Sequence, residues 1–334
     1  MRSIVMKGPM DCRIDEEPEP ALAPGRIKVR IRYCSVVMEN VGLYTGSDPR
    51  LRQPGNPLYR GFPQYQAGEI IADVVEVASD VQGVQVGDRY ASYAAYREVQ
   101  VIAPDAWTKI HMGVPAEAAI SQAFSGTTLH AVRRAHLEIG DDILIIGAGP
   151  MGALLAPWSR LAGAGRIIVA DLYPRRLEIA RRLGATHVVN PRESDLAAAV
   201  QEISEGNGPD VVFDAGNTAS TFPLALELAR PQGKVVVLSW HTQPITIADI
   251  TKDFYHKEIE IIATRASGPA ATYRSPYLRW TSRESQQLIA RWMGEGRFDP
   301  SPIVTGRRPL AEFVAAMEAL QQHADQHLKT LIEW

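Results

Sequence analysis

The stretch DILIIGAGPMGALLAPWSRLAGAGRIIVAD, residues 142–171, decides the fold of the central part of this 334-residue chain. An apolar run of strand type leads directly into Gly147, Gly149 and Gly152, which are spaced as G-x-G-x-x-G, and a run of helix formers follows. In such a turn the first glycine permits the tight bend, the second lets the backbone approach a pyrophosphate, and the third lets the helix pack on the strand. The stretch therefore predicts a strand–turn–helix unit whose helix N-terminus binds a dinucleotide.

Asp171 ends the next predicted strand, nineteen residues after Gly152, which is about the spacing expected for an acid that accepts the ribose hydroxyls of NAD. The carboxylate would repel the 2′-phosphate of NADP, whereas Arg175 and Arg176 suit a phosphate and keep NADP open. NAD is therefore favoured over NADP. The alternative is a glycine turn in an ordinary α/β domain with a capping acid, which the surrounding strands and helix disfavour. The predicted cofactor-binding residues are Gly147, Ala148, Gly149, Met151, Gly152, Asp171 and Arg176.

The rest of the chain has two different patterns. Residues 1–118 contain short alternating strand-like runs between Pro and Gly turns, which predicts a mainly β domain. In residues 119–267 strands alternate with helices, which indicates right-handed βαβ units and a doubly wound parallel sheet. A loop-rich stretch, two amphipathic helices and a short strand follow. We therefore expect an α/β protein with two domains.

Composition excludes several functional classes. Hydrophobic residues make up 46% and charged residues 22%, and the formal net charge of -3 provides no basic surface for nucleic acid. The two cysteines, Cys12 and Cys34, are too few for a disulfide scaffold or a four-thiolate zinc site. The chain contains no signal peptide and no apolar run of about 18 residues, so we expect a cytoplasmic protein without a membrane span.

Several stretches together resemble the medium-chain dehydrogenase/reductase superfamily over essentially the whole chain. They are VVEVASDVQGVQVGDRY (74–90), LHAVRRAHLEIGDDILIIGAGPMG (129–152), DLYPRRLEIARRLGATHVVN (171–190), LARPQGKVVVLSW (228–240), PIVTGRRPLAEFVAAMEAL (302–320) and KTLIEW (329–334). The resemblance implies an oxidoreductase with a GroES-like catalytic domain and a Rossmann domain. Residues 268–334 would then complete the domain formed by residues 1–118. It also implies a homodimer or a dimer of dimers, paired through the edge strand EIEIIATRA.

Many members of that superfamily carry a catalytic zinc, and this chain departs from their pattern. Val37 and Gly68 match two of the ligand positions, and Gln122 or Ala123 matches the third. A catalytic zinc needs three protein N, S or O donors. Cys34 lies three residues before Val37 and on the opposite strand face, so we expect a small core residue there. We predict no catalytic metal and no structural zinc.

Without a metal, side chains must polarise the reacting oxygen and move its proton. Glu69, in QAGEIIADVVEV (66–77), keeps the position of an acid in the superfamily, which makes it a candidate base or substrate anchor. The alternative is that Glu69 braces an arginine or a backbone turn. The two interpretations stay open.

Further candidates come from segments expected to line the cleft. Trp240 and His241 follow the predicted strand VVVLS at its carboxyl end, where ligands bind to parallel sheets. Each of these candidates has a structural alternative. Glu39 and Asn40 could cap a helix, and the tyrosines could pack against other aromatic groups. His241 could be an exposed loop residue, and Arg265 could pair with an acid. The candidate catalytic residues besides Glu69 are Glu39, Tyr65 and His241, and the candidate substrate-binding residues are Asn40, Tyr44, Tyr59, Trp240 and Arg265.

These residue types favour a polar, polyhydroxylated small-molecule substrate such as a sugar, a cyclitol or a related biosynthetic intermediate. The leading hypothesis is a zinc-independent, NAD-dependent oxidoreductase that interconverts a secondary alcohol and a ketone. One alternative is a zinc-free NAD(P)H-dependent reductase of an activated C=C or C=N bond. Another is a non-catalytic dinucleotide-binding protein.

Overall fold

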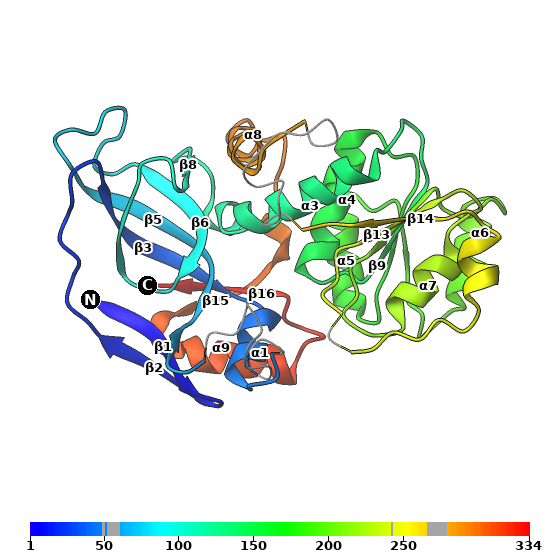
Figure 1. Ribbon diagram of the computed structural model, residues 1–334, viewed down its shortest axis with the longest axis horizontal. Coiled ribbons are helices and arrows are strands. Elements are labelled where there is room, and N and C mark those ends of the chain that lie inside the picture. Colours follow the sequence, from blue (N-terminus) through cyan, green and yellow to red (C-terminus); the bar gives the residue numbers. More distant parts are fainter. Residues whose placement is uncertain (49–50, 52–60, 242, 266–278) are drawn as a thin grey trace. The chain divides into compact units, whose positions relative to one another are not determined.

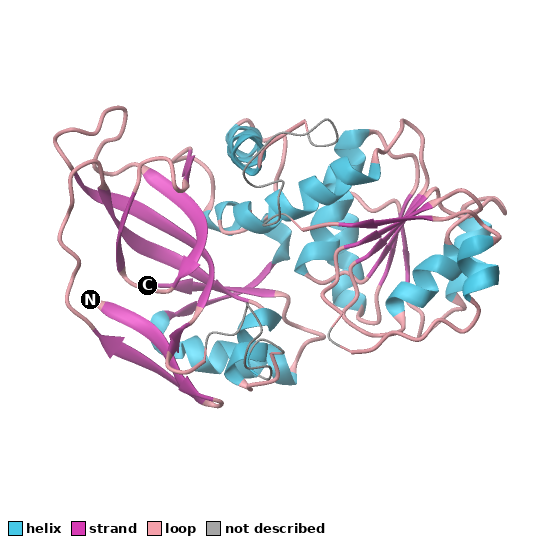
Figure 2. Ribbon diagram, viewed as in Figure 1, coloured by secondary structure: helices cyan, strands magenta, loops and turns pink. Residues whose placement is uncertain are grey.

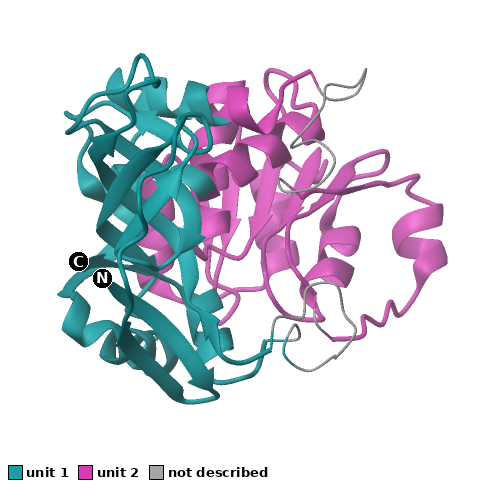
Figure 3. Cartoon of the chain, turned by 60° about the vertical axis from the view of Figure 1, so that its left-hand side comes forward, with its two compact units in different colours: residues 1–123, 286–334 teal, residues 124–285 magenta. Residues whose placement is uncertain are grey.

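The computed structural model describes residues 1–48, 51, 61–241, 243–265 and 279–334. The chain divides into two compact units, which Figure 3 colours separately. Unit 1 contains residues 1–123 and 286–334, and unit 2 contains residues 124–285. The α/β fold class predicted from the sequence is confirmed. The domain boundaries at 118 and 267 stay predictions.

Unit 1 is built on a mainly antiparallel sheet with the order β15-β16-β3-β5-β6-β8, and β7 pairs with β3. Strand β16 lies antiparallel to β3, so the C-terminal strand joins a sheet formed by the first third of the chain (Figure 1). The strands are β3 (Ile27–Val36), β5 (Ala67–Val77), β6 (Arg89–Ala95), β7 (Val99–Ile102), β8 (Thr108–Ile110), β15 (Val304–Pro309) and β16 (Lys329–Glu333).

A second, three-stranded sheet of unit 1 has the order β2-β1-β4. Its strands are β1 (Arg2–Gly8), β2 (Asp11–Glu16) and β4 (Gln64–Tyr65). The helices wholly inside unit 1 are α1 (Met38–Tyr44), α2 (Ala116–Ala119) and α9 (Phe313–Gln322), with the 3-10 turns η4 (Ser301–Ile303) and η5 (Leu310–Glu312). Helices α3 (Gln122–Ala135) and α8 (Ser282–Gly294) run across the two unit boundaries.

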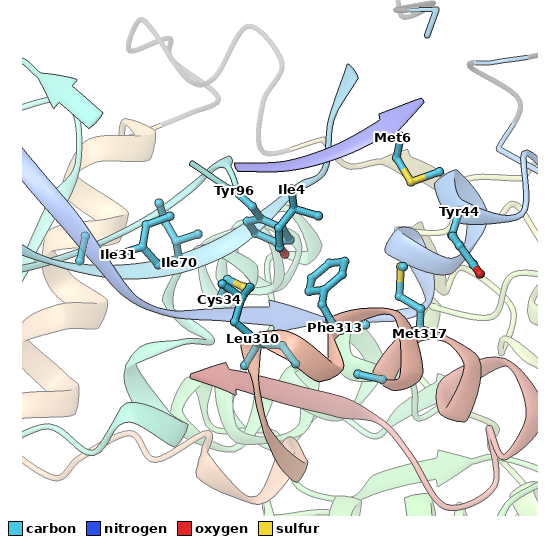
Figure 4. Close-up of a cluster of buried hydrophobic side chains, with 14 of the residues drawn as sticks. Ile4, Met6, Ile31, Cys34, Tyr44, Ile70, Tyr96, Leu310, Phe313 and Met317 are labelled. Carbon is cyan, nitrogen blue, oxygen red and sulfur yellow. The ribbon is translucent and has the colours of Figure 1, made fainter. Parts of the chain in front are cut away.

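The core of unit 1 joins side chains from β1, β3, β5 and α9 (Figure 4). Tyr96 and Phe313 pack edge to face at its centre, with ring centroids 5.8 Å apart. Cys34 is completely buried in this cluster, which confirms the expectation of a core residue. Helix α1 packs beside α9, and this contact turns the inner face of α1 toward the core.

Unit 2 contains a six-stranded, fully parallel sheet with the order β11-β10-β9-β12-β13-β14, flanked by helices (Figure 2). Its strands are β9 (Ile143–Ile146), β10 (Ile167–Ala170), β11 (His187–Val189), β12 (Val211–Asp214), β13 (Lys234–Val237) and β14 (Glu260–Ala263). Its helices are α4 (Pro150–Ala162), α5 (Pro174–Arg182), α6 (Leu196–Ile203) and α7 (Thr221–Leu228), with the π-helical turn η2 (Thr251–Tyr255).

From β9 the chain builds the sheet outward through β10 and β11, and it then returns to build β12, β13 and β14 on the other side. The strand order therefore reverses between β9 and β12. In doubly wound sheets, ligands bind outside the carboxyl ends of the strands at this reversal. The predicted doubly wound parallel sheet is confirmed. Across the described part of the chain, each helix is too short or too polar to cross a membrane.

Candidate active site

The glycine-rich turn follows β9 at the carboxyl edge of the unit 2 sheet. Gly147 has a φ of +95°, and a Cβ atom there would lie 3.0 Å from the carbonyl oxygen of Ala215. A Cβ atom on Gly152 would collide with the carbonyl oxygen of Gly147. A Cβ atom on Gly149 would meet nothing within 4 Å. Two glycines are therefore required by the close approach of the backbone, whereas the third keeps one side of the turn open to a ligand.

Helix α4 begins directly after this turn, with Gly149 as its N-cap and Pro150 as its first residue. Gly149 has no side chain to cap the first N–H groups of the helix. Backbone donors and the positive end of the helix dipole suit a phosphate at this position. Met151, in the first turn of α4, is half-buried.

Asp171 ties the end of β10 to the glycine turn. The backbone N–H of Ala148 donates to Asp171 Oδ2 at 2.7 Å, and the backbone N–H of Tyr173 donates to Oδ1 at 2.9 Å. A guanidinium nitrogen of Arg176 lies 3.8 Å from Oδ2. The carboxylate is thereby held beside the loop that the sequence predicts to bind the pyrophosphate, as a ribose-binding acid requires.

Two arginines lie close to the ring of Tyr173, which follows Asp171 by two residues. The guanidinium of Arg176 lies 4.7 Å from the ring centroid, and that of Arg192 lies 5.3 Å from it. Arg192 is absent from the predicted site because it follows β11, far along the chain from the glycine motif. Arg175, which the sequence marks together with Arg176, is exposed.

A second set of polar groups lies where β12 and β13 end. His241 Nε2 is 2.6 Å from Oδ2 of Asp214, the completely buried last residue of β12. Ser239 Oγ donates to the carbonyl oxygen of Asp214 at 3.1 Å and lies 3.3 Å from its Oδ1. The candidate His241 therefore has a carboxylate partner that was missed from the sequence. The sequence feature that could have identified this partner is Asp214 itself, an acid directly after the apolar residues Val211, Val212 and Phe213.

The two other candidates of unit 2 lie at the same edge of the sheet. Trp240 follows β13 and is 53% exposed, and Arg265 follows β14 and is exposed. The strands β13 and β14 are parallel neighbours, so both residues come after carboxyl ends. The structure thus brings Trp240, His241 and Arg265 to the edge where a ligand of this sheet binds.

In unit 1, the carboxylate of Glu69 forms an ion pair with the ammonium group of Lys329. Their side chains are 1% and 0% exposed. The ammonium group also donates to Ser121 Oγ at 3.2 Å. Burial lowers the pKa of Lys329, and the charge of Glu69 opposes that shift. This geometry corresponds to the bracing interpretation of Glu69, with a lysine in place of the expected arginine, and it withdraws the carboxylate from an accessible surface.

The strand register explains why two residues separated by 260 positions meet. Cys34 of β3 pairs with Ile70 of β5, and Val36 pairs with Thr330 of β16. Glu69 and Lys329 therefore flank the same end of β3. Lys329 was missed from the sequence because the pairing of β16 with β3 is a long-range contact. The only local signal is a lysine that opens an apolar final strand.

Two of the positions that match zinc ligands of the medium-chain superfamily are next to residues of this ion-pair network. Gly68 precedes Glu69, and Gln122 follows Ser121. Val37 is buried and supplies no donor, and a Cβ atom on Gly68 would overlap the hydroxyl of Tyr96. That hydroxyl donates to the carbonyl oxygen of Ser35, so the phenol fills the space of a side chain at position 68. Gln122 Nε2 donates to the carbonyl oxygen of Gln286 at 3.2 Å.

The three ligand positions therefore offer only the amide of Gln122 and neither a thiolate nor an imidazole. This set does not fit a tetrahedral catalytic zinc. In the described part of the chain, no three His, Cys, Asp or Glu side chains are grouped so that they could hold a metal ion.

Of the three candidates on α1, Asn40 and Tyr44 are buried and Glu39 is half-buried. Asn40 is 1% exposed and accepts from the Val37 N–H at 3.0 Å, while its Nδ2 lies 3.1 Å from Gln66 Oε1 and 3.0 Å from the Ala67 carbonyl oxygen. Tyr44 is 4% exposed within the core, and its hydroxyl lies 3.3 Å from Glu318 Oε1. Both side chains lie on the buried face of α1, which contacts α9, and their role in substrate binding stays a prediction. Glu39 is half-buried in the first turn of α1.

The tyrosine candidates that the structure describes belong to different elements, Tyr44 to α1 and Tyr65 to β4. Tyr65 belongs to β4 of the three-stranded sheet, and its hydroxyl donates to Glu17 Oε1 at 2.7 Å. That hydrogen bond, together with burial, raises the pKa of Tyr65, which disfavours the phenolate. Arg97 lies over the Tyr65 ring at 5.0 Å. Tyr59 lies outside the described residues.

The chain is similar in sequence and fold to known dehydrogenases. Residues 150–283 match the family model described as zinc-binding dehydrogenase. Sorbitol dehydrogenase of Bacillus subtilis is 25% identical over 367 aligned positions, which cover 99% of this chain and 97% of the relative. The 2R,3R-butanediol dehydrogenase of Bacillus subtilis superposes with a TM-score of 0.82 at 22% identity, covering 100% and 99% of the two chains.

An alcohol dehydrogenase of Escherichia coli CFT073, solved with NADH, superposes with a TM-score of 0.83 at 19% identity, covering 100% and 99% of the two chains. Because relatives named dehydrogenases match almost the whole chain, the protein is an oxidoreductase of the dehydrogenase type. These comparisons support the resemblance of the chain to the medium-chain dehydrogenase/reductase superfamily.

Proposed function

We propose that this chain is a zinc-independent, NAD-dependent oxidoreductase that interconverts a secondary alcohol and a ketone on a polar, polyhydroxylated small molecule. The observation that carries the proposal is the fixed position of Asp171 against the open glycine turn. The names of the relatives support the substrate class, since sorbitol and butanediol are polyhydric alcohols. When bound, the nicotinamide supplies the hydride chemistry, and the chain positions the reactants and manages the proton.

The preference for NAD rests on the charge of Asp171. Its carboxylate is held by the N–H groups of Ala148 and Tyr173, so it can also accept the ribose hydroxyls but repels a phosphate there. Arg176 and Arg192, which both lie close to the Tyr173 ring, are the groups that would favour NADP. We place NAD first because Asp171 is fixed by two backbone hydrogen bonds beside the turn.

The proposal of a zinc-free reaction rests on the chemistry of three residues in unit 1. Val37 and Gly68 supply no donor, and the Tyr96 phenol fills the space in which a ligand at position 68 would lie. Glu69, the carboxylate next to Gly68, is neutralised by Lys329. We assign this pair a structural role in unit 1, and we place proton transfer elsewhere.

We also propose that the protein is a homodimer or a dimer of dimers. Strand β14 is the last strand of the unit 2 sheet, and its Glu260, Ile261 and Ala263 are exposed. An edge strand of this kind offers unpaired backbone groups to a second copy. A cytoplasmic location stays a prediction.

The function is tested by supplying the purified protein with NAD⁺ or NADP⁺ and a panel of hexitols, pentitols and inositols. In parallel, NADH or NADPH is supplied with enones and imines, and the absorbance of the reduced nicotinamide is followed. We expect NADH formation with at least one polyol. Turnover of enones or imines alone would replace the proposal by the reductase alternative. Cofactor binding without any turnover would replace it by the non-catalytic alternative.

A further inference from the structure

Asp214 occupies the point at which the unit 2 sheet reverses its strand order. It pairs with Ile146 of β9 on one side and with Val237 of β13 on the other. Gly147 follows Ile146 directly, so the glycine turn and Asp214 lie at adjacent strand ends. An acid in this crevice that is completely buried requires a partner, because an isolated buried charge is strongly disfavoured.

That partner is His241, whose ring is held on several sides. Its Nε2 is 2.6 Å from Asp214 Oδ2, and the ring of Phe222 packs edge-on with a centroid distance of 6.3 Å. A carboxylate can only accept, so Nε2 carries the hydrogen of this bond. In the neutral imidazole Nδ1 is then an acceptor. It is buried, and the described part of the structure gives it no hydrogen-bond partner.

The proposed role of Asp171 in binding the adenosine ribose indicates which half of the sheet the nicotinamide would face. A dinucleotide spans the two halves of a doubly wound sheet, with one nucleotide on each half. Asp171 follows β10, so the β9–β11 half takes the adenosine. A nicotinamide would then lie over the β12–β14 half, which is the half that presents His241 after β13.

We propose that Nδ1 of His241 accepts the hydroxyl proton of the substrate alcohol, with Asp214 as the residue that positions the imidazole. This inference rests on the proposed function. The O–H bond breaks and its proton passes to Nδ1, while the carbinol C–H bond breaks, the C=O bond forms and NAD⁺ accepts the hydride. The alcohol is oxidised and NAD⁺ is reduced. Asp214 stabilises the imidazolium that results, and the proton then passes to water.

By binding Nε2, Asp214 leaves Nδ1 as the ring nitrogen that could accept the proton. Among the described neighbours, Ser239 donates to Asp214 and Phe222 offers only its ring, so neither of them selects the tautomer with the proton on Nε2. His241→Gln removes the base and Asp214→Asn removes the tautomer preference, while both variants keep a polar side chain of similar size. General base catalysis contributes about 10²–10⁴-fold, so turnover in both variants should fall within that range.

The experiment compares these two variants with wild type and with the control His256→Gln, whose histidine is exposed in the same unit. Turnover is measured with the best polyol, NADH affinity by fluorescence titration, and the His241 tautomer by nitrogen NMR of the selectively labelled protein. A His241→Ala variant is supplied with free imidazole.

We expect turnover to fall at least about 100-fold in His241→Gln. The NADH dissociation constant should stay within about threefold, and imidazole should restore part of the activity of His241→Ala. The NMR spectrum should show a protonated Nε2 and a bare Nδ1 in wild type but not in Asp214→Asn. Wild-type turnover in His241→Gln, a parallel loss of NADH binding, or a protonated Nδ1 in the wild-type protein would each overturn the inference while leaving the proposed function in place. An inactive wild type that binds NADH would instead overturn the proposed function, and the inference with it.

Discussion

Lys329, the first residue of β16, and Glu69 of β5 form an ion pair inside unit 1 with almost no solvent contact. The pair joins the C-terminal strand to the N-terminal part of the sheet across β3. Such pairs gain Coulomb energy in a low-dielectric interior but lose the hydration of both ions, so their net contribution to stability is small. The removal of one partner is different, because it leaves an uncompensated buried charge.

We therefore predict that Glu69→Gln or Lys329→Met lowers the free energy of unfolding by about 3–5 kcal/mol. The double variant should lose much less than the sum of the two, because no lone charge remains. Urea denaturation at neutral pH measures all three. The matched control is Glu312→Gln, which breaks the exposed Arg308–Glu312 pair and should cost under about 1 kcal/mol. A Glu69→Gln variant of unchanged stability but abolished turnover would return Glu69 to the role of catalytic base.

The two thiols should be inert in the folded protein. Burial raises the pKa of Cys12 to about 12, with Asp11 adding to the effect, and burial raises the pKa of Cys34 well above its ordinary value. The thiolate is the reactive form, so at mildly alkaline pH neither cysteine should react with a disulfide reagent in native buffer. Both should react after addition of urea. Rapid labelling of one thiol in native buffer would contradict the prediction, because it would show that this thiol is accessible to the reagent.

Asp171→Ser should shift the cofactor preference from NAD toward NADP by about tenfold or more. A hydrogen bond to a charged group contributes about 1.5–3 kcal/mol, and the substitution also removes the repulsion of a phosphate. Adding Arg192→Met to Asp171→Ser should reverse part of the gain in NADPH affinity. Arg192 lies beside Tyr173, close to Asp171, where its guanidinium suits the 2′-phosphate. Dissociation constants for NADH and NADPH measure the shift. An unchanged ratio of the two constants in Asp171→Ser would contradict the assignment of Asp171.

Lys257 caps the C-terminus of α7, and we predict that Lys257→Met lowers the free energy of unfolding by about 1–3 kcal/mol. Its ammonium group donates to the carbonyl oxygens of Leu226 at 3.0 Å, Glu227 at 2.5 Å and Ala229 at 3.1 Å. These carbonyls have no partner inside the helix, and a cation also suits the negative end of the helix dipole. Lys252→Met, at an exposed residue of η2, is the control and should leave stability nearly unchanged. Equal effects of the two variants would argue against the cap.

The parts of the fold that were predictable depend on local patterns. The glycine turn between β9 and α4, and Asp171 after β10, follow from residue spacing within one βαβ unit, so the sequence identifies them directly. The alternation of strands and helices likewise predicts the parallel sheet of unit 2. These features need no knowledge of distant contacts.

The partners that were missed come from distant parts of the chain. Lys329 meets Glu69 through the pairing of β16 with β3, and Asp214 meets His241 because β12 and β13 are neighbours. Tyr96 also comes from another part of the chain. It fills the space beside Gly68, although it does not belong to the segments that carry the zinc ligands in the superfamily. The burial of Asn40 and Tyr44 also depends on a distant contact, because helix α9 packs against α1.

The central claim is that this oxidoreductase works without a metal, and it is tested most directly by turnover before and after removal of metal. The protein is dialysed against a strong chelator, its zinc content is determined by elemental analysis, and polyol oxidation with NAD⁺ is then measured with and without added Zn²⁺. We predict less than about one zinc per ten chains and the same turnover number in both assays, because Val37, Gly68 and Tyr96 leave no set of three donors. Loss of activity on chelation that added Zn²⁺ restores, at one zinc per chain, would contradict the account.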